Sequence, residues 1–182
     1  MVVEQIYDEM ASDYDEKYTD PDSSYMIDED AASEHYNLRI TPGSVLSLGC
    51  GTGQDAAITK AQDFVGLDIS WPMLLKAQEK FPDHRFLKHD CSQSIPIRAE
   101  IIVSIFGTPN YIGIPALIDQ YVRSNARSAF FVFYNDDYVD GVVPEYQTYT
   151  TKQLKTGFAL YNPIVEPLFE GSNYTVVSWC NA

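Results

Sequence analysis

The feature that most constrains the fold of this chain is a glycine-rich turn that directly follows a short apolar run. Val45, Leu46 and Leu48 form the run, and Gly49-Cys-Gly-Thr-Gly53 ends it. Glycine adopts positive φ at little cost and has no side chain to keep a ligand away from the main chain. When such a turn leads into a helix, the free amides of the first helical turn can bind polar groups. The pattern therefore predicts a strand, a ligand-binding turn and a helix.

Apolar runs alternate with amphipathic stretches through the next part of the chain. Runs cover residues 64–69, 85–87, 101–106 and 129–134, and amphipathic stretches cover 54–61, 73–80 and 115–124. Strands that alternate with helices form βαβ units, so we expect a mostly parallel sheet with helices on both faces. The last two apolar runs, 164–169 and 174–179, are separated by only four residues, which predicts an antiparallel hairpin.

Length predicts a single domain over residues 1–182, with an N-terminal helical lid at 1–40 and an α/β core at 41–182. In the lid, a spacing of four predicts one helix, or a broken one, along the stripe of Ile6, Met10, Tyr14 and Tyr18. A second helix is expected over 23–38, with Asp22 and Ser23 as capping residues.

Charge and cysteine usage narrow the class of partner. The formal net charge is −14, which disfavours nucleic acid and anionic membranes as partners. Three scattered cysteines without CxxC spacing indicate a reducing compartment and give no metal site. The sequence shows no secretory leader and no apolar run near the roughly 18 residues that span a bilayer. We expect a soluble, cytoplasmic protein without a bound metal, present as a monomer or a weak homodimer.

A carboxylate follows the glycine turn at the distance that a nucleoside ligand requires. Asp68 ends the next apolar run, and an acid about 20 residues after the first glycine is placed to accept both hydroxyls of a ribose. A dinucleotide site would read GxGxxG, whereas here the third glycine comes one position early and Gln54 stands in its place. The spacing weakens a nicotinamide cofactor, which stays an alternative. A helix-capping or surface role for Asp68 is the other alternative.

These residues resemble a known family. VLSLGCGTG, VGLDIS and the following helix with Met73 and Leu74 are similar to the first two motifs of class I S-adenosylmethionine-dependent methyltransferases, in the small, general type. The segment 86–91 resembles the end of the family's third strand, 100–111 its fourth strand and the loop beside the methyl donor, and 11–15 the part that closes over the methionine end.

The resemblance implies a Rossmann-like seven-stranded, mostly parallel sheet of order 3-2-1-4-5-7-6 with the last strand antiparallel. It implies S-adenosylmethionine as cofactor, S-adenosylhomocysteine as product, and a small-molecule acceptor. The cofactor-binding residues that it implies are Tyr14, Gly49, Cys50, Gly51, Gly53, Asp68, Ile69, Met73, Asp90, Cys91 and Phe106. For Asp90 the alternative is capping of residues 91–93, and for Tyr14 it is an ordinary core position.

One position departs from the family pattern. The family commonly has an acid two residues before the first glycine, where it helps to hold the methionine ammonium, and here that residue is Ser47. Asp13, Asp15 or a carboxylate elsewhere is then expected to compensate.

Methyl transfer from a sulfonium needs positioning and desolvation more than an enzyme nucleophile or a metal, so no catalytic residue is assigned. Aromatic faces stabilise a cation, which makes Tyr14, Phe106 and Tyr111 candidates near the methyl group. A base, where the acceptor needs one, would be His35 or an N-terminal carboxylate. The N-terminal helices and residues 135–149 are expected to cover the acceptor. Open alternatives are a protein that binds the cofactor without catalysis and a methyltransferase that acts on a protein.

Overall fold

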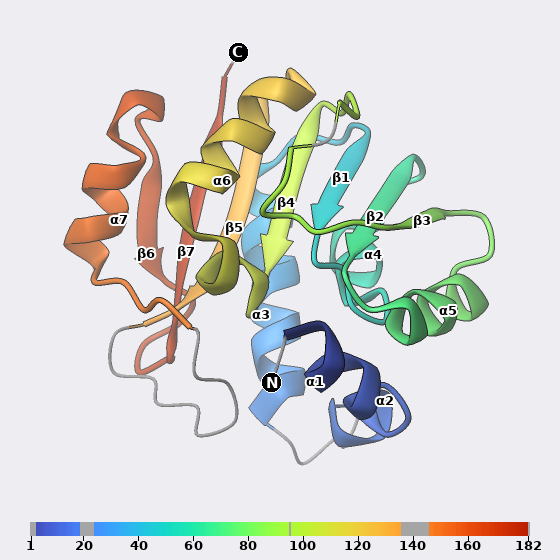
Figure 1. Ribbon diagram of the computed structural model, residues 1–182. Coiled ribbons are helices and arrows are strands. Elements are labelled where there is room, and N and C mark those ends of the chain that lie inside the picture. The colour runs from blue at the N-terminus through green and yellow to red at the C-terminus, as the bar shows by residue number, and fades with distance from the viewer. Residues whose placement is uncertain (1–2, 19–23, 95, 136–145, 182) are drawn as a thin grey trace.

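The computed structural model describes residues 3–18, 24–94, 96–135 and 146–181. One seven-stranded sheet crosses the molecule in the order β3-β2-β1-β4-β5-β7-β6 (Figure 1). The strands are β1 (Val45–Leu48), β2 (Phe64–Asp68), β3 (Arg85–Lys88), β4 (Ile101–Ile105), β5 (Ser128–Tyr134), β6 (Ile164–Pro167) and β7 (Tyr174–Cys180). β1 to β5 pair in parallel, and β7 is antiparallel to both β5 and β6. The strand order and the terminal hairpin predicted from the sequence are confirmed.

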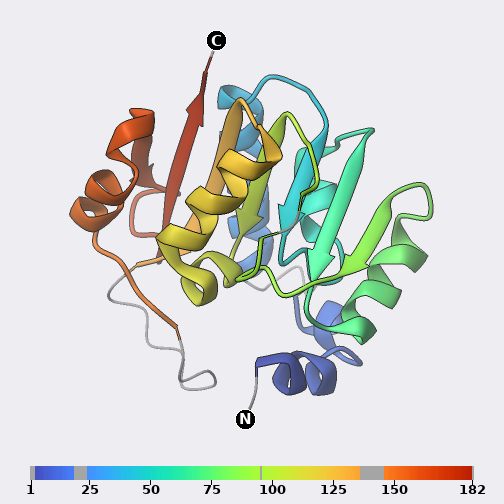
Figure 2. The same cartoon turned by 45° about the horizontal axis from the view of Figure 1, so that its top comes forward.

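Helices cover both faces of this sheet, as expected (Figure 2). The helices are α1 (Val3–Met10), α2 (Tyr14–Tyr18), α3 (Ser24–Arg39), α4 (Gln54–Thr59), α5 (Trp71–Lys80), α6 (Thr108–Ser124) and α7 (Thr151–Gly157). One face packs against α3, α4 and α5, and the other packs against α6 and α7. The short α7, which begins with a capping box of Thr150 and Gln153, was not predicted from the sequence. Among the described residues, no helix is long and apolar enough to cross a membrane.

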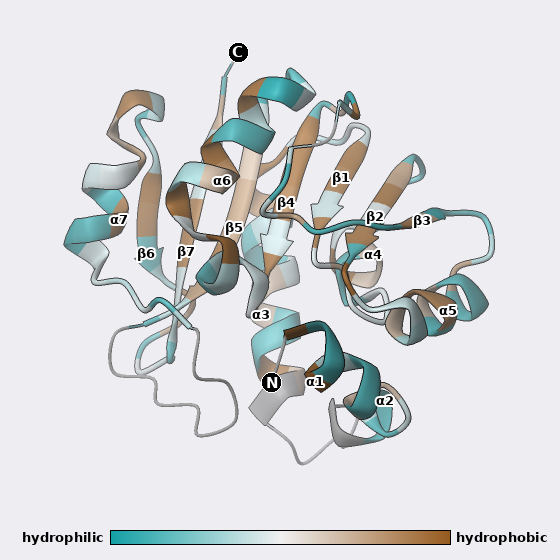
Figure 3. Cartoon of the chain, in the orientation of Figure 1, coloured by the Kyte–Doolittle hydropathy of each residue, from teal (hydrophilic) through white to brown (hydrophobic). Residues whose placement is uncertain are grey.

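The central strands are buried on both faces, which explains why their sequences are continuous apolar runs. Every residue of β1, β2, β4 and β5 is buried. Consecutive side chains enter opposite layers, because side chains alternate across a strand: Val45 packs with α3 and α4, and Leu46 packs with α6 and α7. Figure 3 shows this buried apolar sheet in brown, with the more polar α1 and α2 outside it.

The first 40 residues do not form one helical lid, because α1 and α2 lie apart from α3. The predicted stripe breaks after Met10, and a second short helix begins at Tyr14. These two helices lie below the carboxyl ends of β1, β2 and β4 (Figure 1). α3 instead belongs to the core, because Tyr36 packs edge-on against Phe130 of β5 with ring centroids 5.5 Å apart. The predicted caps Asp22 and Ser23 lie outside the described residues.

Candidate functional site

The glycine turn leaves β1 with a backbone that side chains would disturb. Gly49, Gly51 and Gly53 have φ of 74°, 53° and 98°. A Cβ on Gly49 would lie 1.7 Å from Oγ1 of Thr108, and a Cβ on Gly53 would lie 2.8 Å from the Phe81 ring. The first and third glycines therefore make room for the protein's own packing, and their contacts with a cofactor stay predictions.

Gly51 is the glycine that presents bare backbone. The nearest atom to a Cβ at this position would be Oε1 of Gln54, 3.7 Å away, which is an ordinary contact. The Gly51 amide donates to Oδ2 of Asp68 at 2.8 Å, and the Ser70 amide donates to Oδ1 at 2.9 Å. The Ile69 amide also donates to this carboxylate. Because a carboxylate has about four lone-pair sites, Asp68 keeps acceptor capacity for a ligand.

Asp68 thus faces the glycine turn, as the sequence predicted. Its side chain is buried, which excludes the surface alternative, and Ser70 is the N-cap of α5, which excludes the capping alternative. Burial raises the pKa of Asp68, while the amides of Ser70 and Gly51 act in the opposite direction.

A second buried carboxylate lies under the turn, next to the position where the family acid is missing. The fully buried Ser47 donates from Oγ to Oδ2 of Asp55 at 2.6 Å. Asp55 belongs to the first turn of α4, is 2% exposed, and also binds the backbone of Ile105 at the end of β4. Desolvation raises its pKa to about 8, with the Ser47 bond opposing the shift. The carboxylate beside Ser47 is therefore Asp55, which the sequence analysis did not single out, and not Asp13 or Asp15.

Replacing Asp55 by asparagine should increase the free energy of unfolding at pH 8 and reduce its dependence on pH. The pKa of about 8 in the folded chain lies above the ordinary 3.8, so between these values the folded state binds the extra proton. Stability then falls as the pH rises through this window, by at most about 1.4 kcal/mol per pH unit. Urea unfolding of both proteins at pH 5, 6.5 and 8 measures the difference.

The matched control for this prediction is Asp28→Asn. Burial raises the pKa of Asp28 only to about 6, so its contribution should stop changing above that pH. An Asp55→Asn variant with the same pH dependence as the wild type between pH 6.5 and 8 would contradict the assignment.

Polar contacts attach the N-terminal helices to the turn. Asp15 Oδ1 accepts from Oγ1 of Thr52 at 2.5 Å and from Nζ of Lys80 at 2.9 Å. Asp8 Oδ1 accepts from Oγ of Ser70 at 2.6 Å. α1 and α2 therefore lie against the glycine turn and the start of α5. Tyr14, next to Asp15, is half-buried there, and its contact with a cofactor stays a prediction.

The other predicted residues occupy different surroundings. Asp90 is exposed, and its Oδ1 accepts from the amide and the hydroxyl of Ser92 at 2.9 and 2.7 Å, so its capping alternative is realised. Burial raises the pKa of Cys50 and of Cys91, which makes both thiols unreactive and leaves their backbone for binding. Met73 is fully buried, whereas Ile69 is half-buried; their cofactor contacts and that of Asp90 stay predictions.

An aromatic group borders the turn between β4 and α6. Phe106 and Gly107 both have positive φ, 58° and 68°, a conformation that is uncommon for phenylalanine. Beyond them the Tyr111 ring stacks on Tyr146 at 4.3 Å, and its hydroxyl lies 3.3 Å from that of Tyr7. Tyr7 and Tyr146 were not predicted, because α1 and the segment before α7 reach Tyr111 only in the folded chain.

His35 has a packing role. Its Nε2 lies 2.7 Å from the carbonyl of Leu168, to which it donates, and its Nδ1 lies 2.9 Å from Arg39. Nε2 joins α3 to the residue after β6, and Nδ1 faces Arg39 of the same helix and Glu166 of β6, 3.2 Å away. The structure therefore does not support His35 as a base.

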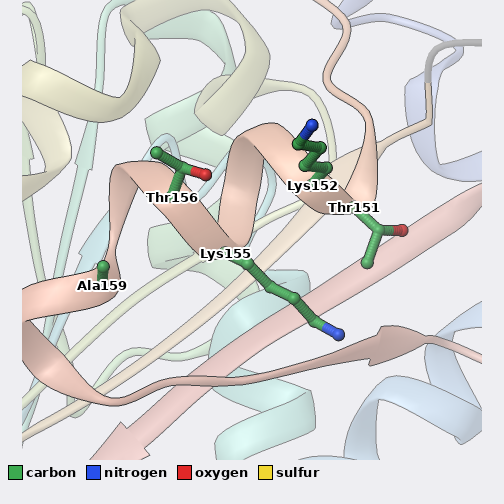
Figure 4. A pocket seen from close by; sticks show the side chains of 5 residues that line it. All are labelled: Thr151, Lys152, Lys155, Thr156 and Ala159. Atoms are coloured by element: carbon green, nitrogen blue, oxygen red, sulfur yellow. The ribbon is translucent and has the colours of Figure 1, made fainter.

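An open hollow elsewhere does not belong to this site. It lies over α7, on the outside of the helix (Figure 4), and none of the predicted cofactor residues lines it. Its lining residues are Thr151, Lys152, Lys155, Thr156 and Ala159.

Comparison with known proteins agrees with this geometry. A protein-family profile described as a methyltransferase domain matches residues 45–124, which include the glycine turn, Asp68 and Asp90. The chain contains a class I S-adenosylmethionine-dependent methyltransferase domain. A segment of 80 residues in this chain is 29% identical to a carboxy-S-adenosyl-L-methionine synthase of Helicobacter pylori (strain J99). The match covers 41% of this chain and only a third, 33%, of the relative.

Solved structures share the fold of this chain over nearly its whole length. Magnesium protoporphyrin IX methyltransferase of Synechocystis PCC 6803, with bound S-adenosylhomocysteine, superposes with a TM-score of 0.72 at 13% identity, over 99% of this chain and 98% of its own. A chain in the complex between the Haloferax volcanii Trm112 methyltransferase activator and the putative methyltransferase gives a TM-score of 0.75 at 13% identity, over 98% and 97%. At these identities the likeness shows the fold alone.

Proposed function

We propose that the protein transfers a methyl group from S-adenosylmethionine to a small-molecule acceptor. The observation that carries the proposal is the carboxylate of Asp68, which is buried, turned toward the bare backbone of Gly51, and keeps acceptor capacity for a ligand. Both residues lie at the carboxyl edge of the sheet, beside the point where the strand order reverses between β1 and β4. Ligands of open α/β sheets bind at such a switch point.

The residues at this edge fit the cofactor. Asp68 would hold the ribose hydroxyls, Asp90 and the backbone at Cys91 would meet the adenine, and the glycine turn would receive the amino-acid end. Bound S-adenosylmethionine supplies an activated methyl group. The chain has to orient that group and keep water away from it, a task that needs no nucleophilic side chain.

The aromatic group of Phe106, Tyr111, Tyr146 and Tyr7 supports a small acceptor. Aromatic faces attract a cationic centre and exclude water from it. Burial raises the pKa of Tyr146, so its hydroxyl stays protonated and bonds to Tyr111 within the aromatic group. The net charge of −14 disfavours a nucleic-acid acceptor, and the Synechocystis relative is named for a porphyrin, which is a small molecule.

S-adenosylmethionine should stabilise the protein against heat, and NAD should not. A specific ligand at 100 times its dissociation constant adds about 2.7 kcal/mol, which raises the melting temperature by several degrees in a chain of this size. Differential scanning fluorimetry with S-adenosylmethionine, S-adenosylhomocysteine and NAD measures the shifts. A shift with NAD alone would favour the nicotinamide alternative and reject the proposal.

Transfer itself is tested with methyl-labelled S-adenosylmethionine and a panel of amines, phenols and carboxylic acids. The proposal predicts label in an extractable small molecule. Binding without any labelled product identifies a cofactor-holding protein, and label that stays with precipitated protein from an added extract identifies a protein acceptor; either result overturns the small-molecule assignment.

A further inference from the structure

We infer that Asp55 supplies the negative charge that binds the ammonium group of S-adenosylmethionine, and that the cofactor expels a proton from this carboxyl group when it binds. The inference rests on the proposed function. It assigns to a helix residue the charge that Ser47 cannot provide.

The position of Asp55 along the sheet edge corresponds to the amino-acid end of the cofactor. Asp90 follows β3 and Asp68 ends β2, so the adenine and the ribose would lie over the β3–β2 side. The amino-acid end must then continue toward β1 and β4. Asp55 is held between these two strands, by Ser47 of β1 at 2.6 Å and by the backbone of Ile105 at the end of β4.

Among the described residues, the charged groups that shift the pKa of Asp55 most are carboxylates. The charged and titratable groups that act on it from neighbouring elements are Asp68 of β2 and Glu29 of α3, and the Cys50 thiol of the turn lies near enough to feel its charge. No ion pair of the described residues includes Asp55. A buried carboxylate that has hydrogen bonds but no opposite charge beside it is costly, and a cationic ligand group would reduce that cost.

The raised pKa of Asp55 implies that cofactor binding releases a proton. The pKa of Asp55, about 8 through burial, keeps most of the group protonated at pH 7 before binding. An ammonium beside the carboxylate favours its charged form and lowers the pKa. The O–H bond of the carboxyl group then breaks, the proton passes to the buffer, and the carboxylate and the ammonium form an ion pair.

Calorimetric titration at pH 7 in buffers of different ionisation heat measures the proton count directly. The wild-type protein should release close to one proton for each S-adenosylmethionine or S-adenosylhomocysteine bound. The probe 5′-methylthioadenosine, which lacks the amino-acid end, should release close to none. Equal proton counts for the three ligands would overturn the inference, and this comparison needs no variant.

Two variants separate charge from structure. Asp55→Asn should bind S-adenosylmethionine about tenfold more weakly at pH 8, which corresponds to about 1.4 kcal/mol, and should release no proton. Asp28→Asn, a change at another buried acid on α3, should keep both the affinity and the proton count. Moving the carboxylate back to the strand, in the double variant Ser47→Asp and Asp55→Ser, should recover most of the affinity that Asp55→Ser alone loses.

The failure of this inference is distinguishable from the failure of the proposed function. A wild-type protein that does not bind S-adenosylmethionine at all contradicts the proposed function. A wild-type protein that binds it without releasing a proton, together with an Asp55→Asn variant of unchanged affinity, overturns the role of Asp55 and leaves the methyltransferase assignment intact.

Discussion

The Asp68→Ala variant should bind S-adenosylmethionine at least about a hundredfold more weakly than the wild type. A hydrogen bond to a charged group contributes about 1.5–3 kcal/mol, and the loss of two bonds to the ribose hydroxyls is therefore at least about 3 kcal/mol. The same carboxylate holds the Gly51 amide at 2.8 Å, so the turn also loses its orientation. Calorimetric titration at pH 8 measures the affinity, and the melting temperature without ligand shows whether the variant is folded.

The control for this variant is Asp90→Ala. Asp90 is exposed, and one of its carboxylate oxygens accepts from Ser92. Solvent weakens the hydrogen bonds that such an exposed group makes to a ligand. Its removal should cost less than tenfold in affinity. An Asp68→Ala variant that is folded and binds within threefold of the wild type would contradict the ribose-binding role.

The Gly49→Ala variant should lose about 2–5 kcal/mol of its free energy of unfolding. A φ of 74° costs an alanine about 1–2 kcal/mol, and forcing a methyl group into a packed region costs a further 1–3 kcal/mol. That methyl group would lie 1.7 Å from Oγ1 of Thr108, so the start of α6 has to move. Urea unfolding measures the loss.

Gly51→Ala is the matched control in the same turn. Its new methyl group would meet only Gln54, at 3.7 Å, so only the conformational cost of about 1–2 kcal/mol remains. Thr108→Gly, combined with Gly49→Ala, should recover the steric part of the loss. Equal stability of the Gly49→Ala and Gly51→Ala variants would show that the two glycines do not have the different roles described above.

Most of the fold and one half of the site were predictable from the sequence, because their signals are local. The apolar run at Val45, the glycine turn and Asp68 lie within one βαβ unit, whose handedness and pairing follow general rules. The interval of only four residues before Tyr174 fixed the antiparallel hairpin in the same way. These features needed no contact between distant segments.

The remaining features depend on contacts that no local pattern contains. Tyr7 and Tyr146 contact Tyr111 from before and after it in the sequence, 104 residues away in the case of Tyr7, and His35 contacts the carbonyl of Leu168, just after β6. Asp55 lies two residues after the last glycine of the turn. Its contact with Ser47 could not be predicted from the sequence, because a carboxylate in the first turn of a helix ordinarily interacts with the helix dipole.

Gly51 and Asp68 together are proposed to form the binding site of an adenosyl cofactor. A crystal structure of the protein with S-adenosylhomocysteine tests it most directly. Both ribose hydroxyls should lie within hydrogen-bonding distance of the Asp68 carboxylate, and the amino-acid end should lie above the turn, on the β1–β4 side. A ligand bound elsewhere, or one that leaves Asp68 without contact, would contradict the claim.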